Sequence, residues 1–156
     1  MTTTMRLPQL TRIPNGIVIA FLVLSFIGFI DAGFLTIEHF RGSVPPCNIA
    51  SGCEAVTTSA YSQIFGIPVA LGGAIYYLAV FILSLAYLDR RNPRLFNIAA
   101  LLTIFGFLFS AWFVFVQLVL LKAICEWCMY SALTSTTLFI LSSYLWVQNR
   151  SDRAIV

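Results

Sequence analysis

The chain has 156 residues, of which 60% are hydrophobic and only 10% are charged. Soluble proteins have roughly 45–50% apolar and about 25% charged residues. A chain this short has no interior large enough to bury the excess, so the composition excludes a soluble domain. The formal net charge of +3 is small and its sites are scattered, which argues against a nucleic-acid partner. We therefore expect a single transmembrane domain over residues 1–156.

Four segments are predicted to cross the membrane, a distance that takes about 20 mostly apolar residues. They cover about residues 17–37, 67–87, 98–121 and 129–147. The first is interrupted by Asp31, and the second begins with Pro68 in its first turn, where proline is tolerated. Because lipid cannot hydrogen-bond the backbone, these segments must be helices. The predicted fold class is therefore all-α, an integral membrane four-helix bundle.

Basic residues predict the orientation of the bundle, because Lys and Arg gather in cytoplasmic loops. Seven of the nine basic residues fall on one side of a four-span bundle, whereas Arg41 and Lys122 fall on the other. The seven are Arg6, Arg12, Arg90, Arg91, Arg94, Arg150 and Arg153. Both termini are therefore expected in the cytoplasm. The loop over about residues 38–62 and the start of the fourth helix are expected to face outward.

All four cysteines fall on the outward side, where disulfides persist. Cys47 and Cys53 lie in the long loop, and Cys125 and Cys128 lie at the start of the fourth helix. Four cysteines allow three pairings, among which the sequence alone does not choose. If the loop turns, Cys47 and Cys53 can form a short bridge that is open to attack by a thiolate from outside.

The Cys-x-x-Cys of Cys125 and Cys128 is predicted to be a reactive pair, because residues i and i+3 share one face of a helix. The positive end of the helix and Lys122 favour a thiolate there, whereas Glu126 opposes it. The loop pair would then react with soluble thiols, and the Cys-x-x-Cys would react with a lipid-soluble acceptor. A membrane disulfide relay requires both kinds of access. The other readings are two structural bridges and a four-cysteine zinc site, which an oxidising compartment disfavours. No metal is expected.

Two further side chains have competing readings. Asp31 lies inside a span, where an ionisable residue is functional by default, and it either relays protons or simply reaches a polar neighbour. Trp127, between the two cysteines, is interpreted as an anchor at the membrane interface.

Two stretches resemble the vitamin K epoxide reductase (VKOR) family in its bacterial branch. They are "CNIASGCEAVTTSAYSQIFGIPVALGGAIYY" and "CEWCMYSAL". The resemblance covers residues from about 29 to 145. Its most specific features are Cys47, Cys53, Ser59, the "FGIP" of Phe65 to Pro68, and the pair Cys125 and Cys128.

The resemblance implies a four-helix bundle around a quinone of the menaquinone, ubiquinone or vitamin K type. The Cys-x-x-Cys would be the active centre, with Cys128 next to the quinone ring. Cys125 would exchange with the loop pair, and Cys53 is its expected partner there. Cys47 would take electrons from a protein outside the membrane.

The resemblance also implies a half-helix over about residues 59–64 that caps the quinone pocket. Ser62 stands where animal members have an asparagine facing the quinone, and a serine hydroxyl can donate only one hydrogen bond. Ala132 stands where they have a tyrosine, and it can donate none. The candidate quinone contacts are Ser59, Tyr61, Ser62, Phe65, Phe113 and Ala132.

The expected function is a quinone-dependent thiol-disulfide oxidoreductase in the bacterial cytoplasmic membrane. It would reoxidise a thioredoxin-like (DsbA-like) protein. Many bacterial members carry a fused thioredoxin-like domain, but this chain ends at Val156, so we expect that partner to be a separate protein.

Three alternatives remain at this point. A quinone or vitamin K epoxide reductase that serves quinol production would use the same residues. A DsbB-like quinone reductase is less favoured, since that family carries its Cys-x-x-Cys in the first outward loop. A non-enzymatic four-span protein with structural disulfides is the third.

Overall fold

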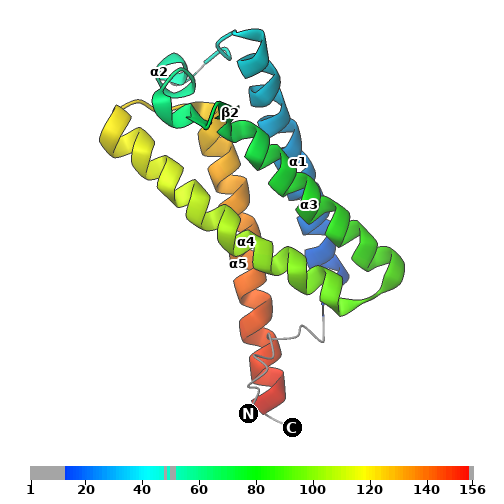
Figure 1. The fold of residues 1–156 in the computed structure, drawn as a ribbon. Coiled ribbons are helices and arrows are strands. Elements are labelled where there is room, and N and C mark those ends of the chain that lie inside the picture. The colour runs from blue at the N-terminus through cyan, green and yellow to red at the C-terminus, as the bar shows by residue number, and fades with distance from the viewer. Residues whose placement is uncertain (1–12, 48, 50–51, 155–156) are drawn as a thin grey trace, which may run out of the picture.

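The computed structural model describes residues 13–154 apart from residues 48, 50 and 51, with side chains as far as residue 150. Four long helices dominate it: α1 (Asn15–Arg41), α3 (Val69–Arg90), α4 (Pro93–Phe115) and α5 (Glu126–Ala154). Helix α1 packs along α3, and α5 packs against both α1 and α4 (Figure 1). The all-α bundle is therefore confirmed.

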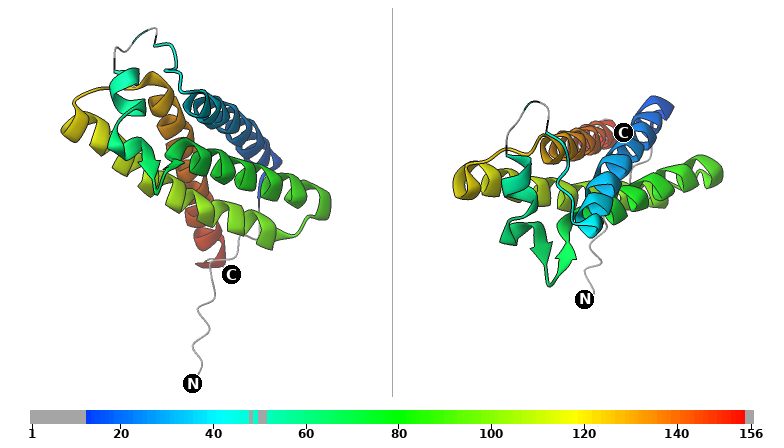
Figure 2. Two further views of the ribbon diagram at one scale, coloured as in Figure 1. Left: turned by 45° about the horizontal axis from the view of Figure 1, so that its top comes forward. Right: turned by 90° about the horizontal axis from the view of Figure 1, so that it is seen from above.

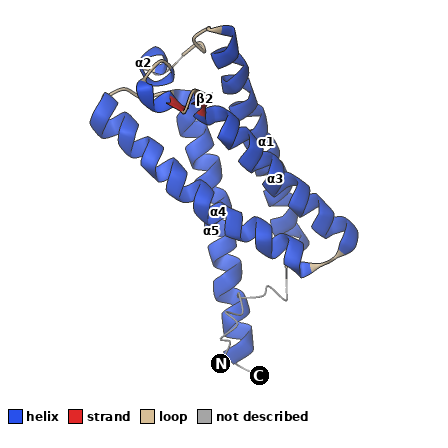
Figure 3. Cartoon of the chain, in the orientation of Figure 1, coloured by secondary structure: helices blue, strands red, loops and turns tan. Residues whose placement is uncertain are grey.

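Short elements between α1 and α3 form a cap over one end of the bundle (Figure 2). They are helix α2 (Cys53–Thr57), the single 3₁₀ turn η1 (Ala60–Ser62), and strands β1 (Gln63–Ile64) and β2 (Ile67–Pro68). The two strands pair antiparallel, with Gln63 opposite Pro68 (Figure 3). The half-helix expected over residues 59–64 is thus wrong in detail. The chain folds back here as a hairpin, whose turn at Phe65 and Gly66 has positive φ angles of 53° and 79°.

Three described helical segments have the length and apolarity needed to cross a bilayer: α1, α3 and the continuous stretch Pro93–Leu121. The third combines α4 with a π-helical end, η2 (Val116–Leu121). Pro68 is the N-cap of α3, one position before the first turn in which we expected it. In these three cases the predicted spans match helices to within a few residues.

The fourth predicted span differs, because α5 is a long helix that lacks this apolarity. Serine and threonine lower its hydropathy, and their hydroxyls donate to carbonyl oxygens one turn earlier in the same helix. Thr134 donates to Tyr130 at 2.9 Å, and Thr136 to Ala132 at 2.7 Å. These hydroxyl groups are therefore satisfied within the helix, and α5 packs in the bundle without a fully apolar surface.

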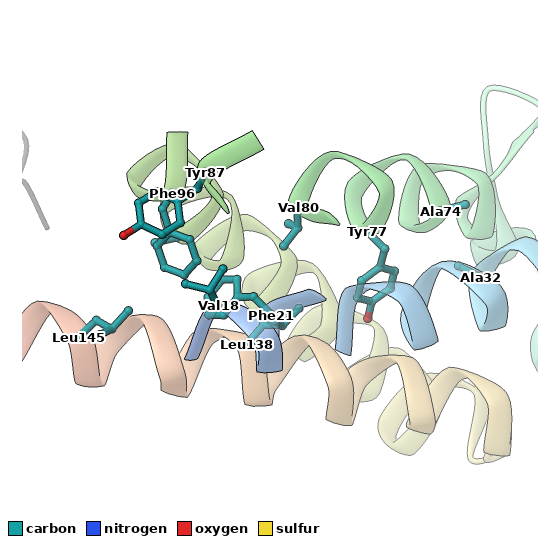
Figure 4. Close-up of a cluster of buried hydrophobic side chains, with 11 residues drawn as sticks. Val18, Phe21, Ala32, Ala74, Tyr77, Val80, Tyr87, Phe96, Leu138 and Leu145 are labelled. Atoms are coloured by element: carbon teal, nitrogen blue, oxygen red, sulfur yellow. The ribbon is translucent and has the colours of Figure 1, made fainter. Parts of the chain in front are cut away.

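The main hydrophobic core lies between the four helices (Figure 4). Phe96 of α4 packs against Phe21 of α1 and Tyr87 of α3, with ring centroids 4.8 and 5.4 Å apart. Arg91, which follows α3, donates a 2.9 Å hydrogen bond to Asn15 Oδ1 at the start of α1. The cysteines lie outside this core, in a second cluster.

Candidate active site

The two cysteine pairs are in different states at the cap end of the bundle. Cys47 and Cys53 form a disulfide with their Cα atoms 6.0 Å apart, whereas Cys125 and Cys128 are free thiols. Of the pairings that the sequence left open, the structure therefore selects the bridge within the loop.

One member of each pair lies in a shared buried cluster. Cys53 is 2% exposed and Cys125 is fully buried, and both pack with Val56 of α2. Cys47 and Cys128 lie at the edge of this cluster. The cap thus places Cys53, which we expected to exchange with Cys125, in the same apolar environment as that thiol.

Gly52 makes this close approach possible. A Cβ atom at Gly52 would lie 2.6 Å from the backbone nitrogen of Ile124 and 2.8 Å from its carbonyl oxygen. Since neither backbone atom can move away as a flexible side chain would, only glycine fits where the cap crosses the segment before Cys125.

Cys125 is held at the start of α5 by its backbone. Its N–H donates to Oε1 of the buried Gln117 at 2.9 Å, and its carbonyl accepts from Met129 N at 3.1 Å in the first turn of the helix. A hydrogen bond from the Cys128 thiol lowers the pKa of Cys125. Cys125 is therefore the thiol of this pair that ionises more readily, and a thiolate is the nucleophile in disulfide exchange.

The two residues between these cysteines hold the cap loop. Glu126 Oε2 accepts a 2.8 Å hydrogen bond from Ile49 N, and Trp127 Nε1 donates a 3.0 Å hydrogen bond to Pro46 O. The two contacts lie on either side of Cys47 in the sequence. We call Glu126 and Trp127 the loop latch.

Trp127, interpreted from the sequence as an interfacial anchor, also has specific contacts within the fold. Its indole packs on Phe34 of α1 with ring centroids 4.9 Å apart, and its N–H is committed to the loop. Composition cannot reveal this role, because the partner is a backbone carbonyl far away in the sequence.

A cavity of about 880 Å³ lies between the cap and the helices, and Cys128 forms part of its wall. Four of the six predicted contacts line it: Ser62, Phe65, Phe113 and Ala132. Apolar side chains supply most of the remaining wall. Such a cavity suits a mostly apolar ligand of the size of a small cofactor.

The other two predicted contacts, Ser59 and Tyr61, are not among the described residues that line the cavity. Ser59 instead shapes the cap: its hydroxyl donates to Val56 O at 2.7 Å, and its carbonyl accepts from the Ser62 hydroxyl at 2.8 Å. The single hydrogen that Ser62 can donate is therefore already used within the cap.

Three polar side chains of the spans lie near the cavity or the thiols. Tyr76 and Tyr77 of α3 line the cavity, and the Tyr77 hydroxyl donates to Ser131 O at 2.6 Å. Asp31 is buried, and neither of its carboxylate oxygens has a hydrogen-bond partner in the described part of the chain. It interacts electrostatically with Cys125 and with Tyr77. We did not predict the two tyrosines, although polar groups inside an apolar span are a usable signal.

Comparison with protein families identifies the chain. The model of the "Vitamin K epoxide reductase family" matches residues 19–143. That range contains all four cysteines and the residues named above as lining the cavity. A comparison with individual curated proteins finds no match.

Proposed function

Because the chain belongs to the vitamin K epoxide reductase family and is therefore a membrane oxidoreductase, we propose that it oxidises a thioredoxin-like (DsbA-like) protein and passes the electrons to a quinone. The observation that carries this proposal is the burial of Cys53 with Cys125 in one cluster, with Cys128 on the wall of the adjoining cavity.

In the first step, the partner protein reduces the loop disulfide. A partner thiolate attacks Cys47, which breaks the Cys47–Cys53 bond and forms a mixed disulfide. The second partner thiol then attacks the mixed disulfide, so the partner leaves oxidised and Cys47 and Cys53 become thiols. Cys47 suits the first attack because it is more exposed than the buried Cys53.

In the second step, the reduced loop pair reduces an oxidised Cys125–Cys128 pair. Cys53 attacks Cys125 and releases the Cys128 thiolate, and Cys47 then attacks Cys53. This restores the loop disulfide and leaves two thiols at the start of α5, which is the arrangement that the structure contains. Two electrons and two protons have then moved inward.

The cavity fits a quinone. It is mostly apolar, Cys128 is on its wall, and two other residues of the wall carry buried hydroxyl groups that lack partners among the described residues. When bound there, a quinone supplies an acceptor for two electrons and two protons. Cys128 would face it, and Cys125, with its lowered pKa, would close the Cys125–Cys128 disulfide again.

We also propose that the cap faces outward. The loop between α3 and α4 and the far end of α5 lie at the opposite end of the bundle (Figure 1). Arg90, Arg91 and Arg94 are at that end, which favours the cytoplasm for it. Impermeant thiol reagents should then reach reduced Cys47 in intact cells, and labelling only after lysis would reverse the orientation.

The proposed function is tested with the purified protein in lipid vesicles. We expect a reduced thioredoxin-like protein to be oxidised only when a quinone is present, with one quinol formed for each disulfide made. Lipid extraction of the purified protein should also recover a bound quinone. If no quinone class supports dithiol oxidation, the cysteines are structural and the proposal fails.

The loop latch gives a further prediction for the transfer between pairs. Glu126→Ala and Trp127→Phe should each slow transfer from the loop pair to the helix pair about tenfold, because each removes one hydrogen bond that holds the loop. Trp127→Phe keeps an aromatic ring against Phe34, and Glu126→Gln keeps an acceptor oxygen and should lose much less. The measurement is stopped-flow reduction of the helix pair by a reduced partner protein.

Two controls distinguish positioning from general damage. A small dithiol that reduces the Cys125–Cys128 disulfide directly should work equally well in wild type and both latch variants. Trp112→Phe, at a half-exposed tryptophan of α4, should change neither rate. If the latch variants slow both donors alike, the contacts stabilise the fold but do not position the loop.

A further inference from the structure

Two residues of the cavity wall carry hydroxyl groups that the proposed relay does not use. Tyr76 Oη on α3 and Ser135 Oγ on α5 are buried, and neither has a hydrogen-bond partner within the described residues. Both residues line the cavity. Burying a polar group without a partner is unfavourable, and native structures rarely leave one so. Two such groups in one cavity therefore indicate a ligand that supplies the missing partner.

The two hydroxyls lie at the same place. Both surround the Cα of Gly106 on α4, where an added Cβ would collide with the Tyr76 hydroxyl and lie 2.8 Å from Ser135 Oγ. The Tyr76 and Ser135 side chains are near enough to interact, but their geometry is not that of a hydrogen bond. Residues of three helices thus meet in one small polar spot, which consists of the Tyr76 and Ser135 hydroxyls. Gly106 has no side chain that would occupy this space.

Three other hydroxyl groups of the cavity wall are already committed to the protein. Ser62 donates to Ser59 O at 2.8 Å, Tyr77 to Ser131 O at 2.6 Å, and Thr57 to Cys53 O at 2.7 Å. Ala132, at the position where animal members of the family have a tyrosine, offers no donor. The spot at Tyr76 and Ser135 therefore has the hydrogen-bonding capacity that these wall positions lack.

We propose that the Tyr76 and Ser135 hydroxyls bind a carbonyl oxygen of the quinone and so orient its ring toward Cys128. The proposal rests on the proposed function and adds the site that holds the polar end of the acceptor. Ser135 follows Cys128 by seven residues on α5, which is about two helical turns or about 10 Å along the axis. The anchor is thus deeper in the bundle than the thiol, and the cavity connects the two.

The test measures the quinone carbonyl directly. A short-chain 1,4-naphthoquinone, labelled with ¹³C at one carbonyl or at the other, is bound to the purified protein and observed by infrared difference spectroscopy. In wild type, one of the two labelled carbonyls should absorb at lower frequency than it does in an apolar solvent, because it accepts a hydrogen bond. Tyr76→Phe removes only the hydroxyl. It should abolish this shift and raise the Kd for the quinone about tenfold, the loss expected for one hydrogen bond.

Two other variants make the result independent of how well Tyr76→Phe folds. Ser135→Ala should reduce the shift without removing the phenol. Tyr87→Phe, a matched control on the same helix, does not contact the cavity among the described residues and should leave the spectrum and the Kd unchanged.

The outcomes separate this anchor from the proposed function. If the quinone binds but its carbonyl bands are the same in wild type, Tyr76→Phe and Ser135→Ala, the hydroxyls hold only water and the anchor is overturned. If wild type binds no quinone and supports no quinone-dependent oxidation, the proposed function is wrong, and the proposed quinone anchor is then wrong as well.

Discussion

Cys47→Ala and Cys128→Ala are expected to abolish overall electron transfer by different routes. Cys47→Ala removes the sulfur that we propose the partner protein attacks, so oxidation of that protein should fall by about 10⁴-fold or more, the scale on which enzymes lose activity when a reacting residue is removed. A small dithiol should still reduce the Cys125–Cys128 pair in this variant. Cys128→Ala removes the sulfur on the cavity wall, and quinone reduction should fall as far with either donor.

The measurement follows both half-reactions in vesicles. Partner oxidation is read from its thiols, and quinol formation from its absorbance, with the partner protein or a small dithiol as donor. Ser143→Ala is the control for disturbance of α5 and should behave as wild type, because the Ser143 hydroxyl donates to Phe139 O of the same helix at 2.9 Å. If the two cysteine variants lose both activities with both donors, an ordered relay is wrong.

The double variant Cys47→Ser, Cys128→Ser is expected to accumulate a disulfide between Cys53 and Cys125. Exchange between the pairs must pass through a mixed disulfide, which the two outer cysteines would normally resolve. Without them, Cys53 and Cys125 have no competing thiol, and they already share one buried cluster. Serine at position 128 keeps a hydroxyl that can donate to Cys125, so the hydrogen bond that lowers the pKa of Cys125 is replaced and not simply removed.

The trapped species is recognised by its mobility and its peptides. The bond closes a long loop of chain, so the non-reduced protein should migrate faster on a denaturing gel, and reductant should restore its normal position. Peptide mapping should recover the fragments that contain Cys53 and Cys125 joined together. The bridge should also form at lower pH than an ordinary thiol would allow, since a depressed pKa keeps the Cys125 thiolate present there.

The complementary double variant Cys53→Ser, Cys125→Ser is the matched comparison. It keeps Cys47 and Cys128, which lie at the edge of the cluster and not at its centre, and it should form little bridge. Efficient bridging only in this variant would exchange the roles of Cys53 and Cys47. No bridging in either variant would favour two independent structural disulfides.

The sequence by itself determined where the helices lie along the chain and that the cysteines fall outside the apolar segments. A bilayer requires a nearly constant length of apolar helix, so three spans were predicted to within a few residues, and the cysteines fell at helix ends and in a loop. These properties depend on local composition. The fourth helix shows the limit of that reasoning. The hydroxyls of Thr134 and Thr136 bond to the backbone of α5 itself, and the surface of α5 packs on α1 and α4, so a hydropathy average describes this helix poorly.

Only the tertiary structure decided which residues meet. The burial of Cys53 beside Cys125, the hold of Glu126 and Trp127 on the cap loop, and the convergence of Tyr76 with Ser135 all join distant parts of the chain. In each of these contacts, a side chain touches a backbone atom or a side chain that belongs to another element. Sequence composition does not carry that information, because it depends on how the helices pack and on where Gly52 and Gly106 leave room for a neighbour.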